Sequence, residues 1–409
     1  FNGGFYNKKE HKFTGGGHRL GDELWAFIPR ELLPHLIWLT KQDYTHVYYV
    51  DLKPKITDAK IFEDDVTHPG GWGTILIAGM RYGGKTIPTE KGSYRSTYFA
   101  LDITDPEQEP KLLWTFDTTD SGVTDLGLSM SYPAVAKVAD EWYVIFGSGP
   151  TNFDQLSNLT EFQKGKVFVL KISGSKGVIN TWIENTNYWK IDKTIEGKQF
   201  HDAFFASPMT IDVDADYNVD VTYIGINYKL GGNETSMLRL TSSATSVVSS
   251  WKLSELYAVG GLDLSRRITA SPSAVLDNKG QLWIYFGTGQ FLGVSDRNQT
   301  DSGVFYGIKE GCWDGDKEGC PRKYTNLLDV TNGTVYFGGE KIEGVSAGVS
   351  DWSQLLNTID SKDGWAIYFE NMHETYDLLS DPPRLLHHKG ERVTTKIGIL
   401  AGYIMFATY

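Results

Sequence analysis

A short strand with glycine at or near its end occurs four times along this chain. Each copy is rich in aromatic and β-branched residues, and the copies follow one another at intervals of roughly 60–80 residues. The four copies are W-G-T-I-L-I-A-G (72–79), W-Y-V-I-F-G-S-G (142–149), V-T-Y-I-G-I-N (221–227) and L-W-I-Y-F-G-T-G (282–289). Such self-similarity indicates a fold built from repeated units.

Three copies share a lead-in, and a strand that can carry the chain back follows each copy. The lead-ins are S-Y-P-A-V-A (131–136), A-S-P-M-T-I (206–211) and A-S-P-S-A-V (270–275). The returning strands are S-T-Y-F-A-L-D-I (96–103), G-K-V-F-V-L-K-I (165–172), S-M-L-R-L (236–240) and G-V-F-Y-G-I (303–308). The repeated unit is therefore strand, turn, strand, loop, strand.

An antiparallel unit of this kind cannot bury its apolar face alone, but copies stacked around an axis bury it and leave few open edges. The composition agrees, because 12 Trp, 22 Tyr and 20 Phe with 44 Gly and only 14 Pro favour many short strands joined by glycine turns. We expect an all-β chain folded as a modified β-propeller of about seven irregular blades. A β-sandwich array is the second choice, and strands that end in glycine also occur in β proteins without any repeat.

Two stretches depart from the repeat. P-R-E-L-L-P-H-L-I-W-L (29–39) has Pro at a plausible first helical position and Leu and Ile at helical spacing, which predicts a short helix laid on the propeller. I-G-I-L-A-G-Y-I-M-F-A (397–407) is the most apolar run, and its glycines and β-branched residues predict a buried strand. No run of about 18 apolar residues occurs, so no helix that spans a bilayer is expected.

The length of the chain allows one large repeat-built domain or two to three smaller ones, because 409 residues exceed what one compact core usually holds. The repeat favours a single propeller domain over residues 1–409. The chain begins at Phe1 without Met or a signal peptide and stops inside an apparent strand. We therefore expect it to be the C-terminal domain of a longer protein, truncated at both ends.

The net charge of the chain limits the classes of partner that it is expected to bind. A net charge of −12 and a pI near 5.3 argue against binding to nucleic acid or to an anionic membrane, which needs clustered Lys and Arg. An acidic surface instead favours cations.

The only two cysteines, Cys312 and Cys320, lie in C-W-D-G-D-K-E-G-C. No third Cys or His is near, so a loop-closing disulfide in an oxidising compartment fits better than a metal site. Two free thiols are the alternative.

The segment D-V-D-A-D-Y-N-V-D (212–220) carries four aspartates at alternate positions, interrupted once by Asn. Calcium takes six to eight oxygen ligands, and a loop with Asp at positions 1, 3, 5 and 9 and a main-chain oxygen at position 7 supplies most of them. Without a cation, two like charges about 5 Å apart repel by roughly 3 kcal/mol at an effective dielectric near 20. The predicted ligands are Asp212, Asp214, Asp216, the main-chain oxygen of Asn218, and Asp220.

The acidic loop is not an EF-hand, because both of its flanks read as strands. Tyr223 stands at position 12, where an EF-hand has a bidentate Glu. Tyr217 stands at position 6, where Gly usually makes the sharp turn, so we expect a less easy backbone conformation there. Water or another segment must complete the ligand set. Magnesium is less favoured because it keeps its waters, and a solvated acidic turn is the remaining alternative.

Residues 79–86, G-M-R-Y-G-G-K-T, match the phosphate-binding pattern G-x-x-x-x-G-K-[ST]. That chemistry needs a helix that starts at the Lys, whereas Pro88 and Gly92 interrupt any helix here. We therefore expect a glycine-rich hairpin loop and no nucleotide binding. Catalytic patterns such as H-E-x-x-H and G-x-S-x-G do not occur, so no enzyme activity is expected.

Several stretches, taken in order, resemble the C-terminal domain of the PilY family, the type IV pilus tip adhesins and biogenesis factors of bacteria. They cover nearly the whole chain. They are G-D-E-L-W-A-F-I-P-R-E-L-L-P-H-L (21–36), H-V-Y-Y-V-D (46–51), Y-F-A-L-D-I-T-D-P (98–106), F-G-S-G (146–149), the acidic loop (212–220), I-T-A-S-P (268–272) and F-G-T-G-Q-F-L (286–292).

The resemblance implies a modified β-propeller with one calcium site on the acidic loop, whose occupancy is linked to the balance of pilus extension and retraction. It also implies a secreted protein, exported through the periplasm and carried at the pilus tip by minor pilins, that acts in twitching motility and in adhesion to host or abiotic surfaces. Tyr217 departs from the Gly common in the family, which bears on calcium affinity more than on the identity of the ion. No R-G-D triplet is present, so integrin recognition is not implied.

Two other propeller classes serve as alternatives. A quinoprotein-like dehydrogenase also uses Trp-rich strands and calcium, but it usually has a vicinal Cys pair, and Cys312 and Cys320 are not adjacent. An integrin-like or extracellular-matrix propeller should carry an acidic loop in several blades, whereas this chain has one.

Overall fold

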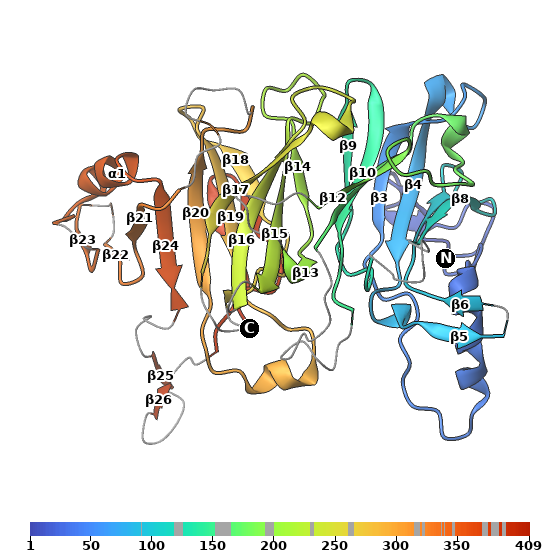
Figure 1. Cartoon of the computed structure of the whole chain (residues 1–409), viewed down its shortest axis with the longest axis horizontal. Coiled ribbons are helices and arrows are strands. Elements are labelled where there is room, and N and C mark those ends of the chain that lie inside the picture. The colour runs from blue at the N-terminus through green and yellow to red at the C-terminus, as the bar shows by residue number, and fades with distance from the viewer. Residues whose placement is uncertain are drawn as a thin grey trace. The chain divides into compact units, whose positions relative to one another are not determined.

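The structure is a computed structural model of the chain, and it consists mainly of antiparallel β-sheets (Figure 1). The residues it describes are 1–90, 92–117, 126–151, 165–192, 200–229, 233–260, 266–314, 320, 324–336, 338, 340–345, 348–369, 375–377, 384–386 and 390–409. No described helix is long and apolar enough to cross a membrane.

The chain folds into two compact units. One comprises Phe1–Thr124 with Lys171–Ile183, and the other comprises Asp125–Leu170 with Glu184–Tyr409. The expectation of a single propeller domain over residues 1–409 stays a prediction.

In the first unit, the β4 sheet has the strand order β3–β4–β7–β8, and the separate pairs β1–β2 and β5–β6 accompany it. The strands are β1 (Phe5–Asn7), β2 (Lys12–Thr14), β3 (Lys55–Lys60), β4 (Trp72–Gly79), β5 (Ile87–Thr89), β6 (Gly92–Tyr94), β7 (Tyr98–Asp102) and β8 (Lys111–Phe116). The 3₁₀ helices are η1 (Arg30–Thr40), η2 (Pro69–Gly71), η3 (Arg81–Gly84) and η5 (Ser175–Gly177).

The second unit has three larger sheets, each named here after the second strand of the predicted repeat unit, which is β10, β15 or β19. The β10 sheet has the order β12–β11–β10–β9, the β15 sheet has β13–β15–β16–β17 with β14 also paired to β15, and the β19 sheet has β18–β19–β20–β24–β21. The pairs β9–β10 and β11–β12, the pairs of the β15 sheet, and the pairs β18–β19, β19–β20 and β20–β24 are antiparallel, whereas β21 and β24 are parallel.

The strands of these three sheets are β9 (Ala134–Val138), β10 (Glu141–Gly147), β11 (Val167–Lys171), β12 (Tyr188–Ile191), β13 (His201–Phe205), β14 (Met209–Ile211), β15 (Val221–Lys229), β16 (Asn233–Thr241), β17 (Lys252–Ala258), β18 (Ser273–Leu276), β19 (Leu282–Gly287), β20 (Val304–Glu310), β21 (Leu327–Asp329) and β24 (Gly364–Tyr368). Separate pairs are formed by β22 (Thr334–Val335) with β23 (Ile342–Glu343), β25 (Thr375–Asp377) with β26 (Arg384–Leu386), and β27 (Gly398–Leu400) with β28 (Tyr403–Met405). The helices are η6 (Val248–Ser250), η8 (Val294–Asn298) and α1 (Trp352–Asp360).

The predicted repeat is confirmed. The four segments that carry glycine form the second strands β4, β10, β15 and β19, and the predicted returning strands form β7, β11, β16 and β20. In the described part of the chain, four sheets contain four or more strands. A total of about seven blades therefore stays a prediction.

The glycines of three second strands allow the next segment of the repeat to pack against them. A Cβ added at any of them would lie 2.1–2.5 Å from a side-chain carbon of that segment, a separation that real side chains do not tolerate. The pairs are Gly147 with Phe205, Gly225 with Ile268, and Gly287 with Val393. Val393 contacts Gly287 as Phe205 contacts Gly147 and as Ile268 contacts Gly225. The C-terminal segment therefore packs against a second strand in the same way as the two earlier segments.

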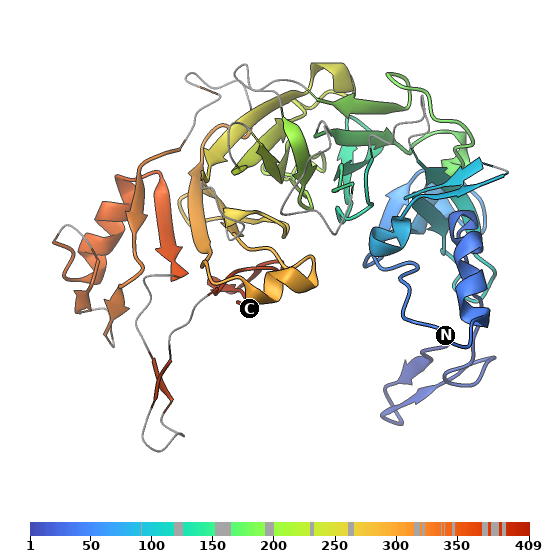
Figure 2. The same ribbon diagram turned by 60° about the horizontal axis from the view of Figure 1, so that its bottom comes forward.

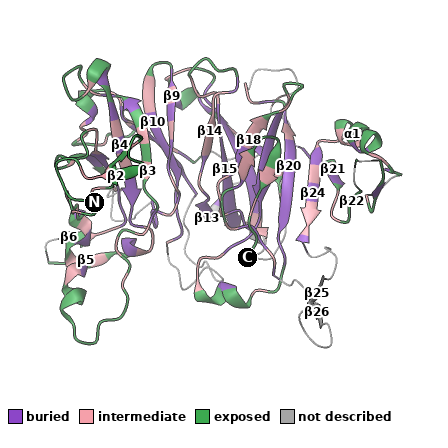
Figure 3. Cartoon of the chain, turned by 180° about the vertical axis from the view of Figure 1, so that it is seen from behind, coloured by how far each residue is buried: buried purple, intermediate pink, exposed green. Residues whose placement is uncertain are grey.

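Two apolar cores hold the three sheets of the second unit together, and the buried runs along their strands are visible in Figure 3. The core shared by the β10 and β15 sheets includes Tyr143, Ile145, Val167, Val169, Phe205, Ile224, Ile226, Leu238 and Trp251. The core shared by the β15 and β19 sheets includes Val221, Tyr223, Met237, Ile268, Ile284, Phe286, Val304 and Tyr306.

A buried ion pair crosses from the β15 sheet to the β19 sheet. The guanidinium of Arg239 on β16 lies 2.7 Å from a carboxylate oxygen of Glu310 on β20, and both side chains are almost fully buried. The Tyr324 hydroxyl donates to the other oxygen of Glu310 at 3.1 Å. Removing one partner of such a pair typically costs about 3–5 kcal/mol, because the other charge is left buried and unpaired.

The predicted helix near the N-terminus is present, but it is the 3₁₀ helix η1. Pro29 lies one residue before it, whereas Pro was expected at the first helical position. Pro34 lies inside η1, where its ring would clash with a carbonyl of an α-helix, and this accounts for the tighter geometry.

The predicted single buried strand over 397–407 is wrong. The segment forms the β27–β28 hairpin, because Ala401 (φ 50°) and Gly402 (φ 81°) reverse the chain. One side of the hairpin packs on the β19 sheet, where the Phe406 and Phe305 rings stack at 4.1 Å, while Leu400 and Tyr403 are exposed. Figure 2 shows this C-terminal end beside η8.

We expect Gly147→Val to lower the free energy of unfolding by about 3 kcal/mol, because the new side chain would overlap Phe205 and separate the β10 and β15 sheets. Denaturant titration followed by tryptophan fluorescence measures the change. Gly293→Ala is the matched control, because a Cβ there meets only the Ser295 hydroxyl at 3.7 Å. An unchanged midpoint for Gly147→Val would contradict the proposed role of the close approach.

Candidate metal centre

The acidic loop connects β14 to β15, which pair with each other through Ile211 and Val221 at its base. The loop therefore joins two strands, as the sequence predicted, and the antiparallel pair brings its first and last residues together. This closure confines the aspartates to a short, tightly turned segment.

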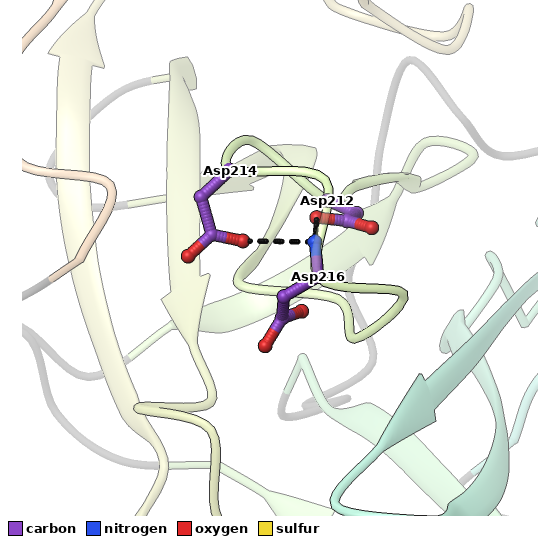
Figure 4. Close-up of side chains that lie close together, drawn as sticks. All are labelled: Asp212, Asp214 and Asp216. Atoms are coloured by element: carbon purple, nitrogen blue, oxygen red, sulfur yellow. Dashed lines mark hydrogen bonds between the residues drawn. The ribbon is translucent and has the colours of Figure 1, made fainter.

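Three carboxylates converge within this loop. One oxygen from each of Asp212, Asp214 and Asp216 lies within 4.8 Å of the others. The main-chain N–H of Asp216 donates to Oδ1 of Asp212 and to Oδ1 of Asp214, both at 3.2 Å (Figure 4). The loop backbone thus orients the side chains on which the predicted site depends.

Further main-chain amides fix the same carboxylates. The N–H of Tyr217 donates to Oδ2 of Asp212 at 2.8 Å, and the N–H of Asn218 donates to Oδ1 of Asp216 at 2.7 Å. Hydrogen bonds from the side chain and the main chain of Asn218 hold the pKa of Asp216 below its ordinary value. Asp216 is therefore an ionised oxygen donor.

Asp220 lies at the closed end of the loop and outside the converging group of three. Its Oδ2 accepts the N–H of Val213 at 2.7 Å. Burial raises the pKa of Asp220, the Val213 hydrogen bond opposes the rise, and the charges of the other three loop aspartates add to it. The role of Asp220 as a ligand stays a prediction.

Asn218 presents its main chain and its side chain to different neighbours. Among the described residues, no donor binds its main-chain oxygen, and the role of this oxygen as a ligand stays a prediction. Its side-chain oxygen accepts from the ammonium of Lys137 near the end of β9 and from the N–H of Ala139 in the β9–β10 turn. Nothing in the sequence indicated these two contacts, because they join residues about 80 positions apart.

The loop backbone turns sharply at two residues other than glycine. Ala215 has φ 62° and Tyr217 has φ 70°, both in the left-handed region that costs a residue with a Cβ roughly 1–2 kcal/mol. The expectation that Tyr217 demands a difficult backbone conformation is confirmed. Its side chain is 84% exposed, so packing does not offset this cost.

The donor set of the loop fits a hard cation. All of its converging ligand atoms are oxygens, at least three of them from carboxylates, which calcium, magnesium and manganese prefer over softer metals. Three negative charges this close repel one another, and solvent weakens the repulsion because Asp214 and Asp216 are exposed. A bound divalent cation would remove that repulsion.

The structure also describes two other features that the sequence singled out, the cysteine pair and the glycine-rich segment 79–86. Cys312 and Cys320 are joined by a disulfide, with their Cα atoms 5.5 Å apart. The glycine-rich segment 79–86 forms the end of β4 and the short helix η3, and β5 follows it in place of a helix. A Cβ at Gly83 would lie 1.8 Å from the Tyr49 carbonyl oxygen, so close packing requires glycine here, and the expected lack of nucleotide binding stays a prediction.

Comparison with known proteins identifies a family. The profile of the PilY1 beta-propeller domain matches residues 30–336. The chain is 28% identical to a type IV pilus biogenesis factor PilY1 homolog of Xylella fastidiosa, over 70% of this chain and 19% of that protein. It is 29% identical to the type IV pilus biogenesis factor PilY1 of Pseudomonas aeruginosa, over 73% of this chain and 24% of that protein. The matches thus span a quarter or less of these curated relatives, which are named as biogenesis factors and not as enzymes.

A solved structure agrees on the fold. The crystal structure of the Pseudomonas aeruginosa PilY1 C-terminal domain superposes with a TM-score of 0.57 at 23% identity, and it covers 95% of this chain and 72% of that one. The predicted β-propeller class and the resemblance seen in the sequence are confirmed. The chain therefore belongs to the family of the PilY1 beta-propeller domain.

Proposed function

We propose that this chain is a calcium-binding, non-enzymatic propeller domain of a type IV pilus-associated protein. The observation that supports calcium is the convergence of Asp212, Asp214 and Asp216 on a strand-to-strand loop whose amides orient their oxygens. The main-chain oxygen of Asn218 and a carboxylate oxygen of Asp220 are the further proposed ligands. Water would complete the six to eight positions that calcium takes.

Calcium is favoured over magnesium by the number of carboxylates offered. Magnesium demands near-octahedral geometry and usually keeps several waters, whereas calcium accepts irregular oxygen cages. A loop with two strained residues fits the more tolerant ion better. The affinity decides whether the site switches at micromolar calcium or stays filled at the millimolar level of extracellular modules.

The role in the pilus rests on the family and on the names of the relatives. We propose that the domain acts in pilus biogenesis, in the balance of extension and retraction that drives twitching motility, and in surface adhesion. Its partners would be minor pilins at the pilus tip and a host or abiotic surface, and its location would be extracellular after export through the periplasm. Calcium would lock the acidic loop in a conformation that a partner in the retraction machinery senses.

Calorimetric titration of the demetallated protein with calcium should show one saturable site. Asp216→Ala should abolish it, because this change removes a converging oxygen and the acceptor of the Asn218 amide. Asp301→Ala removes an exposed aspartate outside the loop and should bind like the unmodified protein. Magnesium should bind far more weakly. Absence of heat, together with no calcium by elemental analysis, would exclude the calcium site.

Tyr217→Gly should raise calcium affinity by about fivefold, which corresponds to about 1 kcal/mol of relieved left-handed strain. The same titration measures it. Tyr228→Phe, a change on β15 outside the loop, serves as the control for general effects on the sheet. Equal or weaker affinity for Tyr217→Gly would show that the tyrosine conformation carries no cost for binding.

In the bacterium that encodes this chain, Asp216→Ala should shrink the twitching zone several-fold while leaving the protein's abundance unchanged. The physical reason is that the loop would lack the ion proposed to lock it. Asp301→Ala is again the matched control. A variant that binds no calcium in vitro but twitches like the parent strain would refute the proposed link between the site and pilus dynamics.

A further inference from the structure

The β9–β10 turn of the neighbouring sheet lies directly against the acidic loop. The main-chain N–H of Val219, inside the loop, donates to the carbonyl of Lys137 at the end of β9 at 2.7 Å. The Thr210 hydroxyl, on β14, donates to the carbonyl of Val135 on β9 at 3.3 Å. The β10 and β15 sheets thus meet along β9 and β14, and the loop and the turn lie at one end of this contact.

The side-chain amide of Asn218 links the loop to the turn. Its Oδ1 accepts from the N–H of Ala139 at 3.1 Å and from the ammonium of Lys137 at 3.3 Å. Its Nδ2 donates to Oδ2 of Asp216 at 3.1 Å. One planar amide therefore bridges a converging carboxylate on one side and the neighbouring sheet on the other, with its nitrogen as the donor and its oxygen as the acceptor.

The turn is held in an unusual conformation. Ala139 (φ 47°) and Asp140 (φ 66°) both adopt left-handed backbone, which matches the two-residue hairpin connection but is strained for residues other than glycine. The Lys137 ammonium is paired with Asp140 at 2.9 Å while it also contacts Asn218. Contacts from the loop thus stabilise a turn whose own sequence does not favour its shape.

We propose that the side chain of Asn218 is a positioning residue that couples filling of the metal loop to the conformation of the β9–β10 turn. This inference rests on the proposed calcium site. The turn holds Asn218 so that its main-chain oxygen is available to the ion and its Nδ2 orients Asp216. A filled loop in turn restrains Asn218, and through it Ala139 and Lys137.

Such coupling is reciprocal. If an intact turn tightens calcium binding by a given factor, then calcium must favour the ordered turn by the same factor. Coupling between two sites typically amounts to about 5–150-fold in affinity. We expect about tenfold here, because two hydrogen bonds end on the Asn218 side chain, while the Val219–Lys137 main-chain hydrogen bond remains without it.

Hydrogen–deuterium exchange with and without saturating calcium, alongside calorimetry, tests the coupling on the whole chain. In the unmodified protein, calcium should slow exchange both in the loop peptide (212–220) and in the turn peptide (137–141). In Asn218→Ala, calcium should bind about tenfold more weakly and protect the loop at saturation, while the turn stays unprotected. Asn298→Ala, which changes an exposed asparagine of η8, should behave like the unmodified protein.

The outcomes separate the two proposals. Calcium binding with equal protection of the turn in Asn218→Ala and in the unmodified protein would overturn the coupling alone, as would protection confined to the loop in the unmodified protein. No calcium binding by the unmodified protein would overturn the proposed function and the coupling with it. Exchange in β10 and β16 reports whether each variant is folded.

If Asn218→Ala proves misfolded, Asn218→Asp serves as the second variant. It keeps the acceptor for Ala139 but loses the donor to Asp216, and calcium should still protect the turn in it.

Discussion

The packing of the repeated units against one another depends on the absence of a side chain at one position in three of the second strands. Gly147, Gly225 and Gly287 leave room for a residue of the following segment to approach the backbone directly. An approach this close fixes how far one sheet can slide along the other, because a shift would drive a side chain into the backbone. The apolar cores then fill the remaining space between sheets whose register is already set.

That register decides where the acidic loop lies. The loop belongs to the β15 sheet, but it forms hydrogen bonds to Lys137 and Ala139 of the β10 sheet. These bonds exist only because the stacking of the two sheets places the β9–β10 turn next to the loop. Within the loop, amides hold carboxylates close together against their mutual repulsion. Local backbone geometry therefore gathers the negative charges, and the stacking of sheets supplies the contacts that hold the loop from outside.

The sequence predicted what is local and periodic. The second strands, their returning strands and the strand-to-strand position of the acidic loop followed from composition and spacing, and the strain at Tyr217 followed from a residue type at a known turn position. The sequence did not predict that η1 is a 3₁₀ helix or that the C-terminal segment forms a hairpin. Pro34 changes a helix without erasing its apolar spacing, and Ala401 with Gly402 reverses a chain whose apolar run continues on both sides. The contacts of Asn218 could not be predicted, since they join positions 79 and 81 residues apart and depend on how two sheets stack.

The ion pair between Arg239 and Glu310 also has a consequence for the order of folding. Its partners lie 71 residues apart, on strands of different sheets. Burial of the Arg239 guanidinium is unfavourable until Glu310 on β20 provides a carboxylate to pair with it. The β15 sheet therefore cannot be completed in a step that precedes the folding of β20. The two sheets must mature together, and contacts this distant in sequence slow folding. The β15 sheet thus stays incomplete until the segment that carries Glu310 is also free to fold, and in this interval it is most open to aggregation or to a chaperone.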